Sequence, residues 1–268
     1  MKKLYTRLEI MNDVKTAWVI GKYTFIEILK SRVIYNTFFL GLGLLLISYV
    51  AAEFTFGVPQ KVALDFGLGA LSLSATGIAI FLGGSLVHKE IESRTVQMIL
   101  SRPVKRHVFM VGRIFGMSAL LVINVLILGV MTTVMYFILG GSFDVLILWS
   151  ILFSLLEAVV MLNVVVLFSM VTTTTLSVIF SLLILILGHN ISNSLELNAV
   201  KSSPILETVI KVYSYIFPDL SRLNIKDFIL YENSLSVLYL CKMTIYGFFY
   251  SIILLCISSV IFSQKDLE

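Results

Sequence analysis

Charged residues are scarce in this chain. Asp, Glu, Lys and Arg make up 13% of its 268 residues, whereas 58% of the residues are hydrophobic and the mean hydropathy is +0.99. Soluble domains usually carry about 25% charged residues. A chain of this composition has too few polar residues for a soluble enzyme domain beside its apolar runs. The composition therefore predicts a polytopic membrane protein.

Proline and cysteine are also rare, with four and two residues. The prolines mark no linker, so we expect a single membrane domain. Cys241 and Cys256 both fall in the last apolar run, which fits neither a disulfide framework nor a zinc site. The histidines match no zinc signature either, and we expect them at the membrane interface: His88, His107 and His189.

Sequence motifs for catalysis are missing as well. The chain has no Gly-x-x-x-x-Gly-Lys-Ser/Thr loop to cradle ATP phosphates, no His-Glu-x-x-His and no Gly-x-Ser-x-Gly. The formal net charge of +4 comes from cations at the ends of apolar runs, which indicates membrane orientation rather than nucleic-acid binding. We therefore predict no enzyme activity, no metal site, no bound cofactor and no nucleic-acid partner for this chain.

Six apolar runs are long enough to cross a bilayer, and they must do so as helices because backbone groups in lipid are hydrogen-bonded within the segment. We place them at residues 33–52, 67–87, 114–139, 146–170, 172–189 and 238–262. The fold class predicted is an all-α polytopic membrane protein, with residues 33–268 as its transmembrane domain. Lys211 and Pro218 interrupt the apolar stretch before the last run, which favours re-entrant or interfacial helices there.

Residues 1–32 precede the first run. Between residues 12 and 32, apolar side chains recur at helical spacing while the lysines lie away from them; the apolar positions are Val14, Trp18, Gly21, Phe25 and Ile28. This pattern predicts an amphipathic helix in the membrane interface. The alternative is a plain helical extension of the first span.

Basic residues gather before the first run and between the second and third. Cytoplasmic loops carry the excess of Lys and Arg in membrane proteins. We therefore expect both termini, and the loop between the second and third spans, in the cytoplasm.

That loop is a long charged segment between two apolar runs. From Leu86 to Leu100 it contains neither Pro nor Gly, so a helix can continue there until Pro103 ends it. A second helical stretch leads into the third span, which gives a helix–break–helix hairpin. Glu90 and Arg94 are four residues apart and can pair on one helix face. Three basic residues are placed to face anionic lipid headgroups: Arg102, Lys105 and Arg106.

The order of residues in this loop resembles the first cytoplasmic loop of the ATP-binding-cassette (ABC) type 2 permeases. The matching pattern is Glu-x-Glu, then Thr, an apolar pair, Pro, basic residues and a small-plus-basic pair, here Glu90, Glu92, Thr95, Ile99, Leu100, Pro103, Lys105, Arg106, Gly112 and Arg113. Arg94 departs from the family, in which many members have Gly before the Thr. In that family the loop is the coupling helix, which takes up the motion of a separate ATPase.

The resemblance implies a permease subunit of an ATP-driven exporter in the bacterial inner membrane. Two ATPase subunits would bind ATP and Mg, and a second permease, the same chain or a relative, would complete the path. The implied ATPase contacts are Glu90, Glu92, Arg94, Thr95, Met98, Ile99, Leu100 and Pro103, with a second cytoplasmic contact at Thr172, Thr173 and Thr174. Residues 217–224 are similar to the permeases of nitrous-oxide-reductase maturation and gliding motility.

Two polar residues fall near the middle of predicted spans. Glu157 lies in the fourth span, where a carboxylate costs about 2.5–3.5 kcal/mol unless it faces protein or water. Asn124 lies at a similar depth in the third span, and we expect a hydrogen bond between the two. The alternatives are a role in the translocation path or in proton-linked gating, or a protonated acid that faces lipid.

Two other functions are compatible with the sequence. A proton-coupled secondary transporter would use Glu157 and need no ATPase. A membrane scaffold or assembly subunit would bind a partner through the charged loop without moving a substrate. Neither accounts for the order of residues in the loop as well as a permease does.

Overall fold

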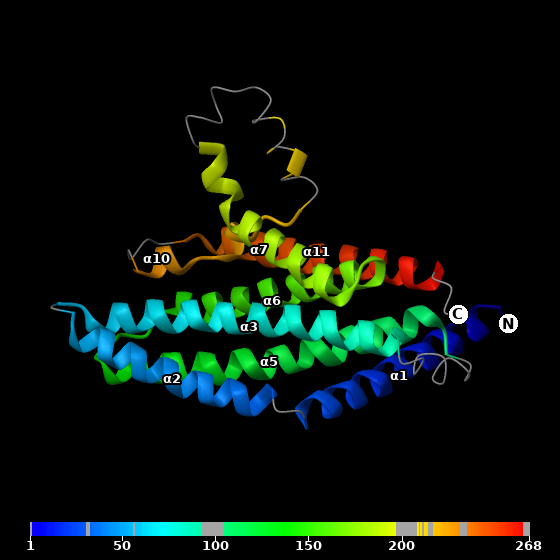
Figure 1. Ribbon diagram of the computed structural model, residues 1–268, viewed down its shortest axis with the longest axis horizontal. Helices are drawn as coiled ribbons and strands as arrows, with labels where there is room; N and C mark the ends of the chain where they lie inside the picture. The colour runs from blue at the N-terminus through cyan, green and yellow to red at the C-terminus, as the bar shows by residue number, and fades with distance from the viewer. Residues whose placement is uncertain are drawn as a thin grey trace.

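The computed structural model describes residues 2–30, 33–55, 57–92, 104–196, 208, 210, 212–213, 217–230 and 235–264. These residues form helices and connections, with no strand among them. Six of the helices are long and apolar enough to cross a membrane, which confirms the predicted all-α polytopic membrane protein. Most of the long helices run roughly along one common axis, whereas the end of α7 turns away from it (Figure 1). We call the end where the first helix begins and the last helix ends the proximal end, and the opposite end the distal end.

The long helices agree in order with the predicted spans but several of them are longer. They are α1 (Lys2–Leu29), α2 (Val33–Glu53), α3 (Pro59–Glu92), α5 (Arg106–Ile138), α6 (Val145–Val171), α7 (Thr174–Glu196) and α11 (Val237–Gln264). Helix α3 begins eight residues before the predicted span, because a proline suits the first helical turn, where its missing N–H has no partner to lose. Helix α5 likewise begins at Arg106 rather than at residue 114.

Helix α6 occupies the centre of the bundle and packs against α3, α5, α7 and α11. Its side chains Phe153, Met161 and Val165 are fully buried. Helix α3 approaches it closely through small residues: a Cβ added to Gly83 would lie only 2.4 Å from Cγ1 of Val165. Small residues at a helix interface let two backbones approach in this way. The interior of the bundle is therefore built around α3 and α6.

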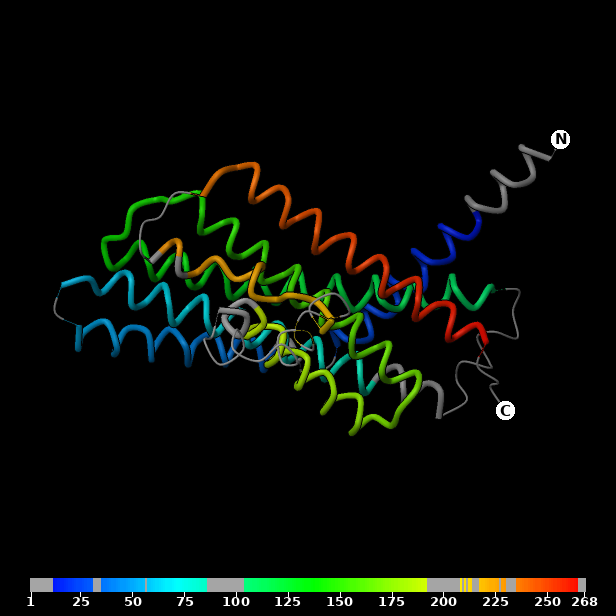
Figure 2. Tube along the Cα trace, turned by 90° about the horizontal axis from the view of Figure 1, so that it is seen from above, coloured from blue at the N-terminus to red at the C-terminus, as the bar shows by residue number. Residues whose placement is uncertain are grey.

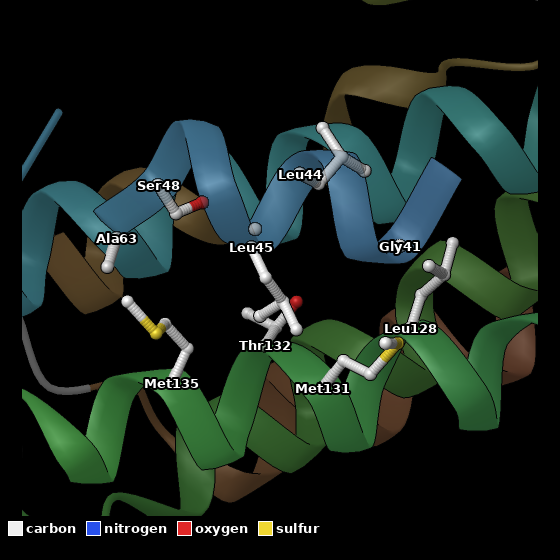
Figure 3. Close-up of a pocket in the computed structure, with 10 residues that line it drawn as sticks. Gly41, Leu44, Leu45, Ser48, Ala63, Leu128, Met131, Thr132 and Met135 are labelled. Carbon is white, nitrogen blue, oxygen red and sulfur yellow. The ribbon is translucent and has the colours of Figure 1, made fainter. Parts of the chain in front are cut away.

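Helix α2 packs against α3 and α5, and comes close to α5 at Gly41, where an added Cβ would lie 2.7 Å from Sδ of Met131. A cavity of about 10 Å³ lies between the three helices, lined among others by Gly41, Met131 and Met135 (Figure 3). This space holds about one water molecule at most. The outward face of α2 remains exposed, including Phe39 and Leu46 at 68% each.

The described part of the chain between α7 and α11 contains two short helices. A 3₁₀ helix, η1 (Leu220–Leu223), packs against α6, α7 and α11, and α10 (Lys226–Leu230) packs against α3 and α6. The second view shows η1 and α10 following one another toward the distal end (Figure 2). Short helical pieces agree with the prediction for this region. Residues 197–207 and 231–234 lie outside the described part of the chain.

Candidate functional site

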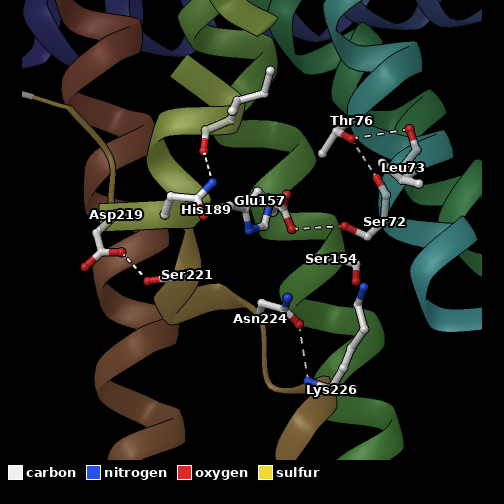
Figure 4. A network of polar contacts seen from close by, with 12 residues as sticks. Ser72, Leu73, Thr76, Ser154, Glu157, His189, Asp219, Ser221, Asn224 and Lys226 are labelled. Atoms are coloured by element: carbon white, nitrogen blue, oxygen red, sulfur yellow. Dashed lines mark hydrogen bonds and ion pairs between the residues drawn. The ribbon is translucent and has the colours of Figure 1, made fainter. Parts of the chain in front are cut away.

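Glu157 lies inside the bundle and is bound from two neighbouring helices. Its side chain is 3% exposed. One carboxylate oxygen accepts a hydrogen bond from the Ser72 hydroxyl of α3 at 3.1 Å, and the other lies 2.8 Å from Nε2 of His189 on α7 (Figure 4). A buried carboxylate requires such partners because transfer of an unpaired charge out of water is costly. We refer to Ser72, Glu157 and His189 as the acid cluster.

The predicted hydrogen bond between Glu157 and Asn124 is wrong. Nδ2 of Asn124 donates instead to the Thr37 hydroxyl of α2 at 2.9 Å. The two residues do lie at comparable depth on neighbouring helices, but Asn124 faces α2 while Glu157 faces α3 and α7. Depth follows from counting residues, whereas the facing direction depends on how each helix is rotated in the bundle.

His189 was expected at the interface, and the structure places it in contact with the buried acid, with 30% of its side chain exposed. A signal for this pairing is present in the sequence. Helices α6 and α7 form a hairpin that turns at Thr172 and Thr173; Glu157 precedes Thr172 by 15 residues and His189 follows Thr173 by 16. Residues equally far from the turn of an antiparallel helix pair lie side by side, because both helices rise about 1.5 Å per residue.

Residues 217–223 pack against α7 next to His189. The Pro218 carbonyl lies against Gly188, where an added Cβ would be 2.9 Å from the oxygen. Buried Asp219 accepts hydrogen bonds from Ser221 at 2.5 Å and Arg222 at 2.8 Å, and its N–H donates to the Tyr246 hydroxyl at 2.9 Å. These contacts attach η1 to α7 and α11.

A lysine that follows this segment approaches the acid cluster from the distal side. Lys226 extends from α10 toward Ser154, one helical turn from Glu157 (Figure 4). Its Nζ would lie 3.8 Å from a Cβ added to Gly69, an ordinary van der Waals distance, so the ammonium group packs beside this glycine of α3. The interior of the bundle thus holds a carboxylate, an imidazole and an ammonium group from three different elements.

The charged loop lies mostly outside the described residues. Arg94, Thr95, Met98, Ile99, Leu100, Arg102 and Pro103 belong to the part that is not described, and of Glu90 and Glu92 only the helical backbone is described, at the end of α3. The continuation of α3 to Glu92 and the start of α5 at Arg106 agree with the two arms of the predicted hairpin.

Two of the basic residues predicted to face headgroups contact other helices. Nζ of Lys105 lies 2.8 Å from Oδ2 of Asp13 on α1, and Nη1 of Arg106 donates to the Ser263 carbonyl of α11 at 3.1 Å. The headgroup contact of these residues stays a prediction. Helices α1 and α11 are both bonded to the start of α5 by these contacts.

Helix α1 packs closely along the proximal part of α5, a contact that the sequence reasoning missed. Cβ atoms added at Gly112 and Gly116 would lie 2.7 Å from the Ala17 carbonyl oxygen and 2.5 Å from the Gly21 carbonyl oxygen. Arg113 adds hydrogen bonds to Thr24 at 2.9 Å and Glu27 at 3.1 Å.

The apolar positions predicted for this helix differ in burial. Gly21 and Ile28 are buried, whereas Val14 and Trp18 are about 60% exposed. The sequence feature that could have predicted the contact between α1 and α5 is the pair of glycines one turn apart near the start of α5, Gly112 and Gly116.

The predicted second contact, at Thr172, Thr173 and Thr174, forms the turn between α6 and α7. Thr172 ends α6, and its hydroxyl donates to the Phe168 carbonyl at 2.9 Å. The start of α7 packs on α3, where a Cβ added to Gly84 would lie 3.1 Å from Cγ2 of Val178. The turn therefore lies at the same end of the bundle as the charged loop.

The chain matches no model of a known protein family, and it matches none of the curated proteins with which it was compared.

Proposed function

We propose that this chain is the permease subunit of an ATP-driven exporter of the ABC type 2 class. Its proximal end would face the cytoplasm of a bacterial inner membrane, where separate ATPase subunits bind the charged loop. The chain itself performs no covalent chemistry in this proposal. A second permease, the same chain or a relative, would complete the path.

The observation that carries the proposal is the length of the two helices that flank the loop. Helix α3 has 34 residues and α5 has 33, so each is about 50 Å long, whereas the hydrocarbon core of a bilayer is about 30 Å thick. Helices of this length extend beyond the membrane and can carry movement of the loop into the bundle without a flexible joint.

The contacts at the start of α5 support the same proposal. The ion pair between Asp13 and Lys105 joins α1 to this region, and the bond from Arg106 to Ser263 joins α11. A force on the loop would therefore reach α1, α5 and α11 together. ATP binding would close the ATPase pair, displace residues 90–100 and shift the spans.

Glu92→Lys and Thr95→Pro are expected to reduce permease-stimulated ATP hydrolysis to the basal rate of the ATPase, because they reverse a charge and break a helix in the proposed contact. The measurement is ATP turnover of the reconstituted complex. Glu53→Lys makes the same charge change at the exposed distal end of α2 and should leave the stimulation unchanged. Full stimulation in both loop variants would contradict the assignment.

A second candidate function, a proton-coupled secondary transporter, is favoured by the contact between Glu157 and His189. Imidazole is the side chain that ordinarily gains or loses a proton near neutral pH, and buried acids and histidines in membranes often serve as proton relays. This function predicts proton uptake into vesicles that contain the chain alone, and its loss in Glu157→Gln. A chain that moves no protons without an ATPase rules the candidate out.

A further inference from the structure

A groove opens between α2 and α3 on the outer surface of the bundle. It encloses about 320 Å³ and is lined by polar as well as apolar residues, among them Asn36, Thr37, Leu40, Ser74, Gly77 and Phe81. No ionisable side chain is among the described residues that line it. The groove therefore suits an uncharged ligand that is apolar over most of its surface.

Two polar groups of the groove have no hydrogen-bond partner in the described part of the chain. Ser74 lines the groove and is only 9% exposed, and its hydroxyl makes no hydrogen bond to a described residue. Asn36 is exposed at the rim, and its amide is likewise without a protein partner among the described residues. Polar groups left unmatched in a membrane cost free energy that a bonded ligand would remove.

The floor of the groove is open at Gly77. A Cβ added to Gly77 meets no atom within 4 Å, unlike Gly67 and Gly83 on the same helix, whose missing side chains make room for α5 and α6. Asn36 and Leu40 follow the proximal start of α2 at Val33 by three and seven residues, or about 5 and 10 Å. The groove thus lies in the half of the bilayer nearer the proximal end.

The groove between α5 and α6 provides a comparison. It is larger, about 420 Å³, but its lining is apolar apart from Thr133, whose hydroxyl already donates to the Gly129 carbonyl at 2.7 Å. Lipid chains alone can cover such a surface, because the described residues that line it include no polar side chain without a hydrogen-bond partner. The α2–α3 groove differs because two polar side chains without a hydrogen-bond partner among the described residues, Ser74 and Asn36, lie beside its apolar lining.

We propose that the α2–α3 groove binds an uncharged amphiphile from the proximal leaflet of the membrane. Its chain lies over Gly77 between Leu40 and Phe81, and its ester, amide or hydroxyl group bonds to Ser74 and Asn36. This amphiphile is the substrate class of the exporter, a part of the inference that rests on the proposed function. Binding itself does not depend on it.

The test uses the full chain in nanodiscs and a monoacylglycerol with a diazirine in its acyl chain as the probe. After illumination, labelled peptides are identified by mass spectrometry. We expect labelling of α2 and α3 in the groove that saturates and that excess unlabelled monoacylglycerol removes. Gly77→Leu should reduce it about tenfold by filling the groove. Gly43→Leu, at an equally open glycine outside the groove, should not change it.

Ser74→Ala tests the polar contact with little risk to folding. It should weaken the probe about threefold, the effect of one neutral hydrogen bond. Labelling by a diazirine hydrocarbon without a head group should not change. Equal effects on both probes, labelling that does not saturate, or equal labelling of the α5–α6 groove would overturn the proposal. So would a change of oligomeric state in Gly77→Leu, since the groove would then hold a second copy of the chain.

The two proposals can fail separately. Saturable labelling of a chain that binds no ATPase would keep the amphiphile site and remove its role as an exporter substrate site. Non-saturable labelling of a chain that does bind an ATPase would overturn the amphiphile site and leave the exporter function standing.

Discussion

His189→Ala is expected to lower the free energy of unfolding by about 2 kcal/mol, within the range for a buried polar group that loses a hydrogen-bond partner. The variant leaves the Glu157 carboxylate, 3% exposed, with the Ser72 hydroxyl as its remaining described partner. The loss stays below the upper end of that range because the exposed part of the His189 site lets water reach the carboxylate. The measurement is reversible unfolding in mixed detergent micelles.

Two further variants separate the pair from local effects on α7. Asn190→Ala removes the next side chain, which is exposed and bonds only within its own helix, and should cost less than about 0.5 kcal/mol. Glu157→Gln removes the charge, so that His189→Ala should cost much less in that background. Equal losses from His189→Ala with either residue at position 157 would show that the two side chains are not coupled.

Gly116→Val is expected to separate α1 from α5. An added Cβ would lie 2.5 Å from the Gly21 carbonyl oxygen, a backbone atom that cannot move unless the helix moves. Hydrogen exchange in residues 13–28 should accelerate by at least about 100-fold, as expected when a docked helix loses its tertiary contacts. The six spans should remain folded.

The matched control is Gly43→Ala on α2, where an added Cβ meets nothing within 4 Å. It should leave the exchange rates of α1 unchanged. Unchanged hydrogen exchange of α1 in Gly116→Val as well would mean that the docking of α1 does not depend on this close contact. The proposal that α1 and α5 move together would then be contradicted.

The spans could be predicted because hydrocarbon sets both their length and their composition. Their ends could not, since helices continue through polar residues once these reach the interface: Lys61 and Asp65 lie inside α3 although they stop the apolar run. Helix α5 likewise includes Arg106 and Arg113.

The polar contacts were harder to predict than the spans. Glu157 and Asn124 were chosen for their depth, and each is indeed buried and hydrogen-bonded, but to other partners. A single sequence does not fix the rotation of each helix, because the apolar surface of a membrane helix faces lipid and protein alike. Only the hairpin of α6 and α7, with its short turn, carried enough information to match Glu157 with His189.

The central claim is that a separate ATPase works through the loop between α3 and α5. The most direct measurement is purification of the tagged chain from its native membrane in mild detergent, with identification of the proteins that accompany it. We predict a near-stoichiometric partner that carries a phosphate-binding Gly-x-x-x-x-Gly-Lys-Ser/Thr loop. A chain that purifies without any such partner, under conditions that preserve other complexes of this kind, would contradict the claim.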